Sequence, residues 1–488
     1  MYRQAAYSTD LRDLDSKGAR ALTFPAAFGP DVELGPEMGR SRDPAFPEIS
    51  ELDVVRHHVG LSQMNYGVDI GIYPLGSCTM KYNPKVAKRA ASDVRATSHH
   101  PSEPSRFVQG NLLLAWNLSN ALCLIAGMDD ITLQPAAGAQ AEFVGARIIA
   151  EYHHSRGQKR DEMIVPDTAH GTNPASSAMA GFRIVEVPSS AEGTLDTDAL
   201  KSAVSKRTAG IMLTNPNTLG IFESKISEIE RIVHGAGGLL YYDGANLNAL
   251  LGRARPGDMG FDIVHYNLHK TFATPHGGGG PGAGAIGVKQ FLSTYLPYPT
   301  IEKGRSGFFL SDRPRSNSIG CIRPYLGNFS VLVMAYAYIL SVGRGIRDVS
   351  KGAVLNSNYL MARLKGHFEV PYIDTTPLRK HEFVLSCEKI KKETGVSAQD
   401  IGRRLLDYGM HAPTVYFPLI VKEALMIEPT ETETLHELDM FADALIEIKK
   451  ECYTAPDTVM SSPHATSRRA LDTLGAARHP VLSWRMER

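Results

Sequence analysis

Lys270 has a sequence setting in which its amine could do chemistry. It lies in NLHKTF, directly after the apolar run DIVHYN, among apolar and aromatic residues. Burying an unpaired ammonium group is unfavourable. Lys270 therefore either reaches a surface carboxylate, as most lysines do, or uses its amine to form a Schiff base with a carbonyl cofactor. The lysine alone does not decide between these interpretations.

Asp243 is a second candidate for chemistry. It ends the apolar run GLLYYD, 27 residues before Lys270. A carboxylate at this place could be a turn or helix-cap residue. It could also keep a pyridine nitrogen protonated, which makes pyridoxal phosphate a better electron sink. A pyridoxal phosphate site requires such a pair: an aspartate at the end of one strand and a lysine at the end of another, with one βα interval between them.

A possible phosphate anchor precedes this pair. LQPAAGAQAEFVGARIIAEYHH places small residues directly before a long amphipathic stretch. Small residues let the backbone approach a ligand, and the free N–H groups of a helix start bind anions. We expect Gly138, Ala139 and Gln140 to bind a phosphate. Alone the pattern is common, and its position upstream of Asp243 and Lys270 strengthens it.

Two other apolar runs also end in polar residues. His170 follows MIVP, where its flat ring could stack on a pyridine ring, although a lone histidine is more often structural. Thr214 and Asn217 lie in TNPNTLGIFE after another run and could contact cofactor or substrate. If these apolar runs are strands of a parallel sheet, its ligands sit at the carboxyl ends of the strands. We therefore expect all these side chains to meet at one site.

Glycine-rich sequence follows Lys270 directly. Seven of the 44 glycines lie between Gly277 and Gly287, in HGGGGPGAGAIGV. The run lacks GxxxxGK[ST], so it is not a P-loop, and a strand follows where the helix of a dinucleotide fingerprint should start. The run indicates a mobile or tightly apposed backbone, or a purely structural loop. His276 at its head is a candidate acid/base or carboxylate-binding group.

The elements that must position these residues alternate between strands and helices. Strands that alternate with amphipathic helices indicate an α/β fold with a mostly parallel sheet and helices on both faces. We predict an N-terminal extended arm over 1–60, a large domain over 61–330, a smaller α+β domain over 331–452 and a C-terminal tail over 453–488. The expected strands of the large domain are MIVP (163–166), RIVEV (183–187), IMLTN (211–215), GLLYYD (238–243), DIVHYN (262–267) and AGAIGV (283–288).

Composition excludes several classes of protein. In 488 residues, 52 Lys plus Arg balance 52 Asp plus Glu, which argues against nucleic-acid binding. The five cysteines form no CxxC, so we expect no metal site, no disulfide framework and a reducing, cytoplasmic location. The N-terminus lacks a signal-peptide core. The longest apolar run, VLVMAYAYIL, is too short to span a membrane and predicts a buried helix.

Several motifs together resemble one family. YPLGSCTMKYNPK, LQPAAGAQAE, IVPDTAHGTNPASSAMAGF, TNPNTLGIFE, YYDGANLNA and NLHKTFATPHGGGGPGAGAIGV look like glycine decarboxylase, the P-protein of the glycine cleavage system. The likeness covers roughly residues 20 to 450. That family occurs as one fused chain or as two homologous subunits. The motif that holds the lysine belongs to the C-terminal half, so this chain resembles subunit 2.

The resemblance implies a pyridoxal phosphate enzyme of fold type I. Lys270 would be the Schiff-base lysine, Asp243 the partner of the ring nitrogen and His170 the stacking residue. Two departures concern loops: the arm reads DLRDLDSKGARALTFP, a looser version of the family pattern, and Ala285 stands where proline is expected. The further cofactor contacts implied are Gly138, Ala139, Gln140, Thr214, Ala245 and His269.

The implied activity is that of glycine dehydrogenase (aminomethyl-transferring), an oxidoreductase of glycine catabolism. Glycine would lose CO₂, and its aminomethyl group would pass to the lipoyl arm of H protein. The implied partners are a homologous subunit 1 in an α2β2 heterotetramer and the lipoylated carrier. We expect Ser77, Cys78, Thr79 and Asn217 to line the substrate or lipoyl channel. Cys78 could be a redox sensor, although an inert thiol is the more common case.

Two alternatives remain open from the sequence. The chain could be a self-sufficient fold type I decarboxylase or lyase of another amino acid, which activity of the isolated chain would favour. It could also be a silent scaffold that binds the carrier protein. The presence of both Lys270 and Asp243 argues against the scaffold.

Overall fold

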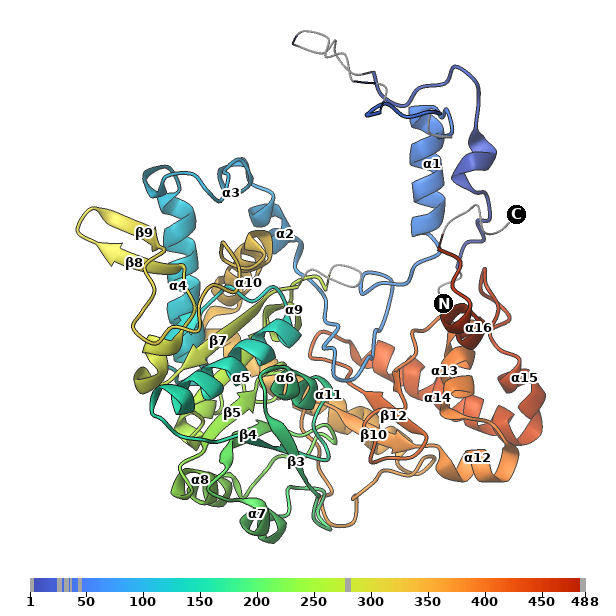
Figure 1. The fold of residues 1–488 in the computed structure, drawn as a ribbon. Helices are drawn as coiled ribbons and strands as arrows, with labels where there is room; N and C mark the ends of the chain where they lie inside the picture. Colours follow the sequence, from blue (N-terminus) through green and yellow to red (C-terminus); the bar gives the residue numbers. More distant parts are fainter. Residues whose placement is uncertain are drawn as a thin grey trace.

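A seven-stranded sheet dominates the computed structural model, which describes residues 4–23, 29, 35, 37–42, 46–276 and 282–482. The strand order is β1-β7-β6-β5-β4-β2-β3 (Figure 1). Strands β3, β2, β4, β5 and β6 pair in parallel, whereas β7 is antiparallel to β6 and to β1. The predicted mostly parallel α/β sheet is thus confirmed. Part of the glycine-rich run, residues 277–281, lies outside the described residues.

Each apolar run that we expected to be a strand is one. Strands of a parallel sheet that are covered on both faces read as continuous apolar runs, and β2, β5, β6 and β7 are buried along their whole length. The short strand β1 at the edge was not predicted. The strands are β1 (Asp130–Thr132), β2 (Glu162–Pro166), β3 (Arg183–Val187), β4 (Thr208–Thr214), β5 (Leu239–Asp243), β6 (Ile263–Asn267) and β7 (Gly284–Val288).

Helices cover both faces of this sheet, as predicted. Successive side chains of a strand point to opposite faces. Tyr242 therefore joins one hydrophobic cluster with Leu118 of α4, and Tyr241 joins another with Val144 of α5. The helices of this part are α2 (Lys85–Ala91), α3 (Val94–Thr97), α4 (Gln109–Ala126), α5 (Gly138–Ser155), α6 (Thr172–Met179), α7 (Thr197–Ala203), α8 (Ile226–Gly235), α9 (Leu268–Thr271) and α10 (Phe329–Val342).

A second sheet follows α10 and has its own core. Strands β10 (Phe383–Ser386), β12 (Ala424–Ile427) and β11 (Thr414–Val415) form an antiparallel sheet in the order β10-β12-β11. Leu360, Phe383, Leu425 and Phe441 belong to one hydrophobic cluster there. The helices of this part are α11 (Ile346–Leu364), α12 (Glu388–Thr394), α13 (Ala398–Asp407) and α14 (Leu435–Thr454).

The two ends of the chain come together beside the second sheet (Figure 1). The backbone N–H of Ser467 donates to Gln4 Oε1 at 2.8 Å. The segment 1–60 that we predicted as an extended arm is not extended throughout: it contains most of a helix, α1 (Glu51–Ser62), which Ser50 caps by accepting the N–H of Asp53. The remaining strands, β8 (Thr300–Gly304) and β9 (Gly307–Ser311), form a hairpin. The remaining α-helices are α15 (Pro456–Met460) and α16 (Thr473–Arg478).

Helix α10 contains the longest apolar run and is a core helix. Leu332 and Ala335 are fully buried in the cluster on one face of the large sheet. Together with α11 it forms the stretch Phe329–Leu364, which by length and composition alone could cross a membrane. A buried core helix passes that test equally.

Candidate active site

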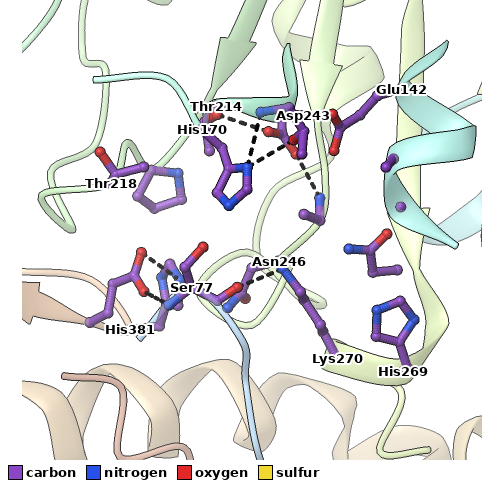
Figure 2. Close-up of a pocket in the computed structure, with 17 residues that line it drawn as sticks. Ser77, Glu142, His170, Thr214, Thr218, Asp243, Asn246, His269, Lys270 and His381 are labelled. Carbon is purple, nitrogen blue, oxygen red and sulfur yellow. Dashed lines mark hydrogen bonds and ion pairs between the residues drawn. The ribbon is translucent and has the colours of Figure 1, made fainter. Parts of the chain in front are cut away.

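A cavity of about 230 Å³ lies at the carboxyl ends of β2, β4, β5 and β6, where the large sheet meets the second one (Figure 2). This is the edge at which parallel α/β sheets bind ligands. It brings together most of the site residues that the sequence predicts. Those that line it are Ser77, Gly138, Ala139, His170, Thr214, Asp243, Ala245, His269 and Lys270.

Asp243 forms one wall of the cavity and is almost completely buried. Its carboxylate accepts hydrogen bonds from the Asn173 amide at 2.9 Å, the Ala245 N–H at 3.1 Å and the Thr214 hydroxyl at 3.2 Å. Burial by itself would raise its pKa, but His265 and these donors outweigh burial and the pKa is lowered. Asp243 therefore stays negatively charged and can pair with a cationic ligand nitrogen.

The neighbours of Asp243 carry little charge of their own at neutral pH. Burial, followed by repulsion from Asp243, raises the pKa of Glu142 to about 8. Burial lowers the pKa of His265 to about 4, although its Nδ1 lies 3.4 Å from Asp243 Oδ1. A protonated Glu142 and a neutral His265 leave the negative charge of this wall on Asp243.

Lys270 lies on the side of the cavity opposite Asp243. It belongs to the short helix α9, directly after β6, and its Nζ donates to the carbonyl oxygen of Ser77 at 2.5 Å. Figure 2 shows Lys270 and Ser77 across the cavity from Asp243. Ser77 and Thr79 have φ values of 67° and 50°, in the region that favours glycine. Such strain persists only where the surroundings hold it.

The start of α5 forms an anion-binding end of the cavity. No described side chain caps this 18-residue helix, and Gly138 and Ala139 at its start line the cavity, which suits a negatively charged group there. A Cβ on Gly138 would lie 2.4 Å from Asn267 Oδ1. Glycine is therefore required there by close approach. Gln140 does not line the cavity, because its Oε1 accepts the N–H of Ala136 at 2.7 Å.

His170 lines the cavity near Thr218 (Figure 2). Its Nδ1 is 2.8 Å from the hydroxyl of Thr172, and the edge of its ring meets Phe417 with centroids 5.4 Å apart. Burial lowers its pKa. It therefore presents a neutral, flat ring to the cavity.

His269 and His276 pack against each other behind Lys270, with ring centroids 4.7 Å apart. Burial lowers the pKa of His269 to about 3 and that of His276 to about 4. Both rings are neutral at neutral pH. A neutral imidazole can act as a base, but it does not offer a positive charge to bind a carboxylate. His276 is not among the residues that line the cavity.

Three predicted channel residues lie beside the cavity without lining it. Asn217 is buried, and its amide holds a turn by donating to the Gly193 carbonyl and the Glu223 carboxyl group. The hydroxyl of Thr79 donates to the carboxylate of Glu428, which directly follows strand β12. Burial raises the pKa of Cys78, which disfavours the reactive thiolate. Their predicted roles in a channel stay predictions.

The sequence analysis missed several residues that line the cavity. His381 and Glu382 come from the second sheet, and no apolar run ends at them. Asn246 could have been found, since it follows Asp243 in the loop after β5. The missed lining residues are Glu142, Thr172, Pro216, Thr218, Asn246, Asn267, His381 and Glu382.

A buried lysine anchors the loop that carries Ser77. Lys81 is 1% exposed, and its Nζ donates to Glu431 at 2.6 Å, to Asn248 Oδ1 at 2.9 Å and to the Thr271 carbonyl at 3.0 Å. Thr271 follows Lys270 directly. The ion pair therefore ties three segments together at the lysine of the cavity.

We expect Lys81→Met to lower the free energy of unfolding by about 3–5 kcal/mol, because it leaves the carboxylate of Glu431 buried without its cation. Urea unfolding of the purified protein measures this. Lys85→Met is the matched control, since Lys85 pairs with Asp69 on the surface and such pairs contribute about 1 kcal/mol at most. Equal losses for the two variants would contradict the expectation.

Known proteins resemble this chain along its whole length. Residues 349–470 match the family described as glycine dehydrogenase, C-terminal domain, and residues 145–290 match aminotransferase class-V. The chain is 55% identical to the probable glycine dehydrogenase (decarboxylating) subunit 2 of Pyrococcus abyssi, over 100% of this chain and 98% of that one. It is 53% identical to the protein of the same description from Caldanaerobacter subterraneus, over 98% and 99% of the two chains.

Solved structures share the fold. A glycine decarboxylase (P-protein) of the glycine cleavage system, in inhibitor-bound form, superposes with a TM-score of 0.70 at 21% identity, over 84% of this chain and 92% of that one. A cysteine desulfurase from Thermococcus onnurineus gives a TM-score of 0.62 at 14% identity, over 78% and 95% of the two chains.

Proposed function

Because the chain belongs to the glycine dehydrogenase (decarboxylating) subunit 2 family, we propose that it decarboxylates glycine with pyridoxal phosphate. The aminomethyl group then passes to the lipoyl arm of H protein. The observation that carries the proposal is the placement of Lys270 and Asp243 on opposite sides of one cavity whose third side is the free start of α5.

The residues present fit pyridoxal phosphate. The α5 N–H groups at Gly138 and Ala139 suit its phosphate, and the carboxylate of Asp243 suits its ring nitrogen. The amide oxygen of Asn267, which lines the cavity, is buried without a hydrogen-bond partner among the described residues, which is the state expected beside a polar ligand. Bound there, the cofactor would supply an electron sink for the electron pair that decarboxylation leaves on glycine.

The side chains of the cavity would act around that cofactor. The Lys270 amine would hold the cofactor and could accept or return a proton. Asp243 would keep the ring nitrogen protonated through its charge. The neutral His170 ring, which lines the cavity, would exclude water there, which favours loss of a carboxylate from an apolar setting.

The partners of the chain follow from the family. We propose that a homologous subunit 1 completes the enzyme as an α2β2 heterotetramer, with lipoylated H protein as the acceptor and the cytoplasm as the location. Membership of a subunit 2 family supports a partner subunit. A fold type I enzyme that acts alone on another amino acid is less well supported, since its likeness to this chain is one of fold.

Exchange of bicarbonate carbon into glycine tests the proposal. We expect exchange with pyridoxal phosphate, lipoylated H protein and subunit 1 present, and none when subunit 1 or the carrier is left out. Exchange by the isolated chain would refute the need for a partner subunit. Turnover of another amino acid, with no exchange into glycine, would refute the substrate.

A further inference from the structure

Two glutamates meet where the second sheet closes the cavity. Strand β10 pairs antiparallel with β12, with Phe383 opposite Ile427. The next residues outward are Glu382 and Glu428, so the register places two acidic side chains opposite each other. A carboxylate oxygen of each lies within 4.8 Å of the other and of a His381 ring nitrogen. Like charges directly opposite each other are destabilising.

Both glutamates are buried, and their surroundings favour a shared proton. Burial, then repulsion from Glu428, raises the pKa of Glu382 well above its usual value. Burial raises the pKa of Glu428 to about 7, while Asn246, Thr79 and nearby cations limit the rise. We therefore expect the pair to hold at least one proton at neutral pH.

The charged and titratable groups around the pair do not replace it as an acid. Lys270 and Lys81 lower the pKa of Glu428, and burial lowers the pKa of His381 to about 3, so that ring is neutral. Neither ring nitrogen of His381 has a hydrogen-bond partner among the described residues, and its side chain lines the cavity. Cys78 stays a thiol because burial raises its pKa.

Hydrogen bonds place Glu382 at the cavity and Glu428 behind it. The Ser77 N–H donates to Glu382 Oε2 at 2.9 Å, while the Ser77 carbonyl accepts from Lys270. The N–H and hydroxyl of Thr79 donate to Glu428 Oε2 at 3.1 and 3.0 Å. Glu382 lines the cavity and Glu428 does not. One residue, Ser77, therefore separates Lys270 from the acid pair.

We propose that Glu382, backed by Glu428, is the acid that protonates the departing lipoyl sulfur, a role that rests on the proposed function. When the aminomethyl carbon bonds to one sulfur, the S–S bond breaks and its electron pair stays on the other sulfur. The disulfide is reduced and the glycine-derived carbon is oxidised. The second sulfur takes the proton of Glu382, which becomes a carboxylate and regains a proton from Glu428 and then from solvent.

Cavity groups on the other side are less suited to this step. Asp243 is ionised and holds the ring nitrogen, and Glu142 stands beside it, away from Ser77 (Figure 2). Lys270 is the remaining rival donor, since it contacts the carbonyl of Ser77, whose N–H contacts Glu382. A rate that depends on Lys270 alone would leave Glu382 without this role.

Infrared spectroscopy of the cofactor-free protein tests the proton itself. We expect a carboxylic-acid C=O band from Glu382 that persists as pH rises through about 7, where Glu428 titrates, and that Glu382→Gln removes. Glu433→Gln is the matched control: burial also raises the Glu433 pKa to about 7, but Glu433 does not line the cavity. An unchanged band in Glu382→Gln would overturn the proposal.

Single-turnover transfer from glycine to the lipoyl disulfide, in the complete enzyme, tests the step. We expect Glu382→Gln to slow transfer by roughly 10²-fold or more and to lose the fall in rate at high pH, and Glu382→Asp to restore that fall. Wild-type rates and pH profile in Glu382→Gln would overturn this inference while leaving the function intact. A wild-type enzyme that never turns over glycine would instead overturn the proposed function.

Discussion

Lys270→Ala is expected to abolish glycine turnover and to remove the visible absorbance of the lysine-bound cofactor. The lysine amine is the group that would hold pyridoxal phosphate covalently, and loss of a covalent catalytic group lowers kcat/KM by several orders of magnitude. Absorbance spectra after reconstitution, followed by the glycine–bicarbonate exchange assay, measure both effects.

The fold of this variant should survive. Lys270 Nζ donates a hydrogen bond to the carbonyl of Ser77, and loss of such a bond changes stability by about 1 kcal/mol. Lys289→Ala is the matched control, since Lys289 Nζ also donates to a carbonyl, that of Gly127, at 2.7 Å and away from the cavity. It should keep the absorbance and the exchange. Absorbance and exchange that persist in Lys270→Ala would remove the basis for the cofactor assignment.

Much of this site could be predicted because it follows one rule of parallel sheets. A strand covered on both faces must be apolar throughout, so the buried strands were visible as apolar runs, and the polar residues after them marked the ligand edge. Asp243, Lys270, His170 and Thr214 were found in this way, and all four line the cavity. The rule needs no knowledge of long-range contacts.

The side of the cavity formed by the second sheet could not be predicted in the same way. Glu382 precedes β10 and Glu428 follows β12, so their meeting depends on an antiparallel register between strands that lie about 40 residues apart. Lys81 was also missed, because its burial depends on Glu431 and Asn248, which are far away in sequence. Gln140 and Asn217 were expected at the cavity, but local hydrogen bonds turn their amides to nearby backbone groups.

These two sides have different tasks in the proposed reaction. The large sheet supplies groups with fixed charge, a carboxylate at Asp243 and a helix start at Gly138, which suit a bound cofactor. The second sheet supplies Glu382, whose proton can leave. The loop with Ser77 contacts both sides through the N–H and the carbonyl of that one residue. Holding and releasing protons are thus separated in space, which keeps the ring-nitrogen partner ionised while an acid stays available.

Asp243→Asn is expected to lower kcat/KM by roughly 10²–10³-fold, the scale for removing one preorganised electrostatic partner. The amide cannot hold a proton on the ring nitrogen through charge. One carboxylate oxygen also becomes an NH₂ group, which cannot accept the hydrogen bonds that the Asn173 amide and the Ala245 N–H donate to this side chain. We therefore expect a lower affinity for pyridoxal phosphate, together with a loss of about 1–3 kcal/mol in the free energy of unfolding without the cofactor.

The pH dependence of the free energy of unfolding distinguishes the effect of the Asp243 charge from the effect of the shape of its side chain. Its pKa in the folded protein is lowered, so its carboxylate stabilises the fold at pH values above the unfolded pKa, about 3.9, and this contribution disappears as pH falls through the folded pKa. The stability gap between wild type and Asp243→Asn should therefore narrow on acidification below about pH 4. Urea unfolding at a series of pH values measures the gap.

Asp258→Asn is the matched control for this series, because Asp258 pairs with Arg255 on the surface at 2.7 Å. A surface pair contributes about 1 kcal/mol at most, so its substitution should leave both cofactor affinity and turnover unchanged. If Asp243→Asn bound the cofactor and turned over glycine as the wild type does, the carboxylate would have no part in the reaction. A gap that stayed constant with pH would show that shape and not charge accounts for the loss of stability.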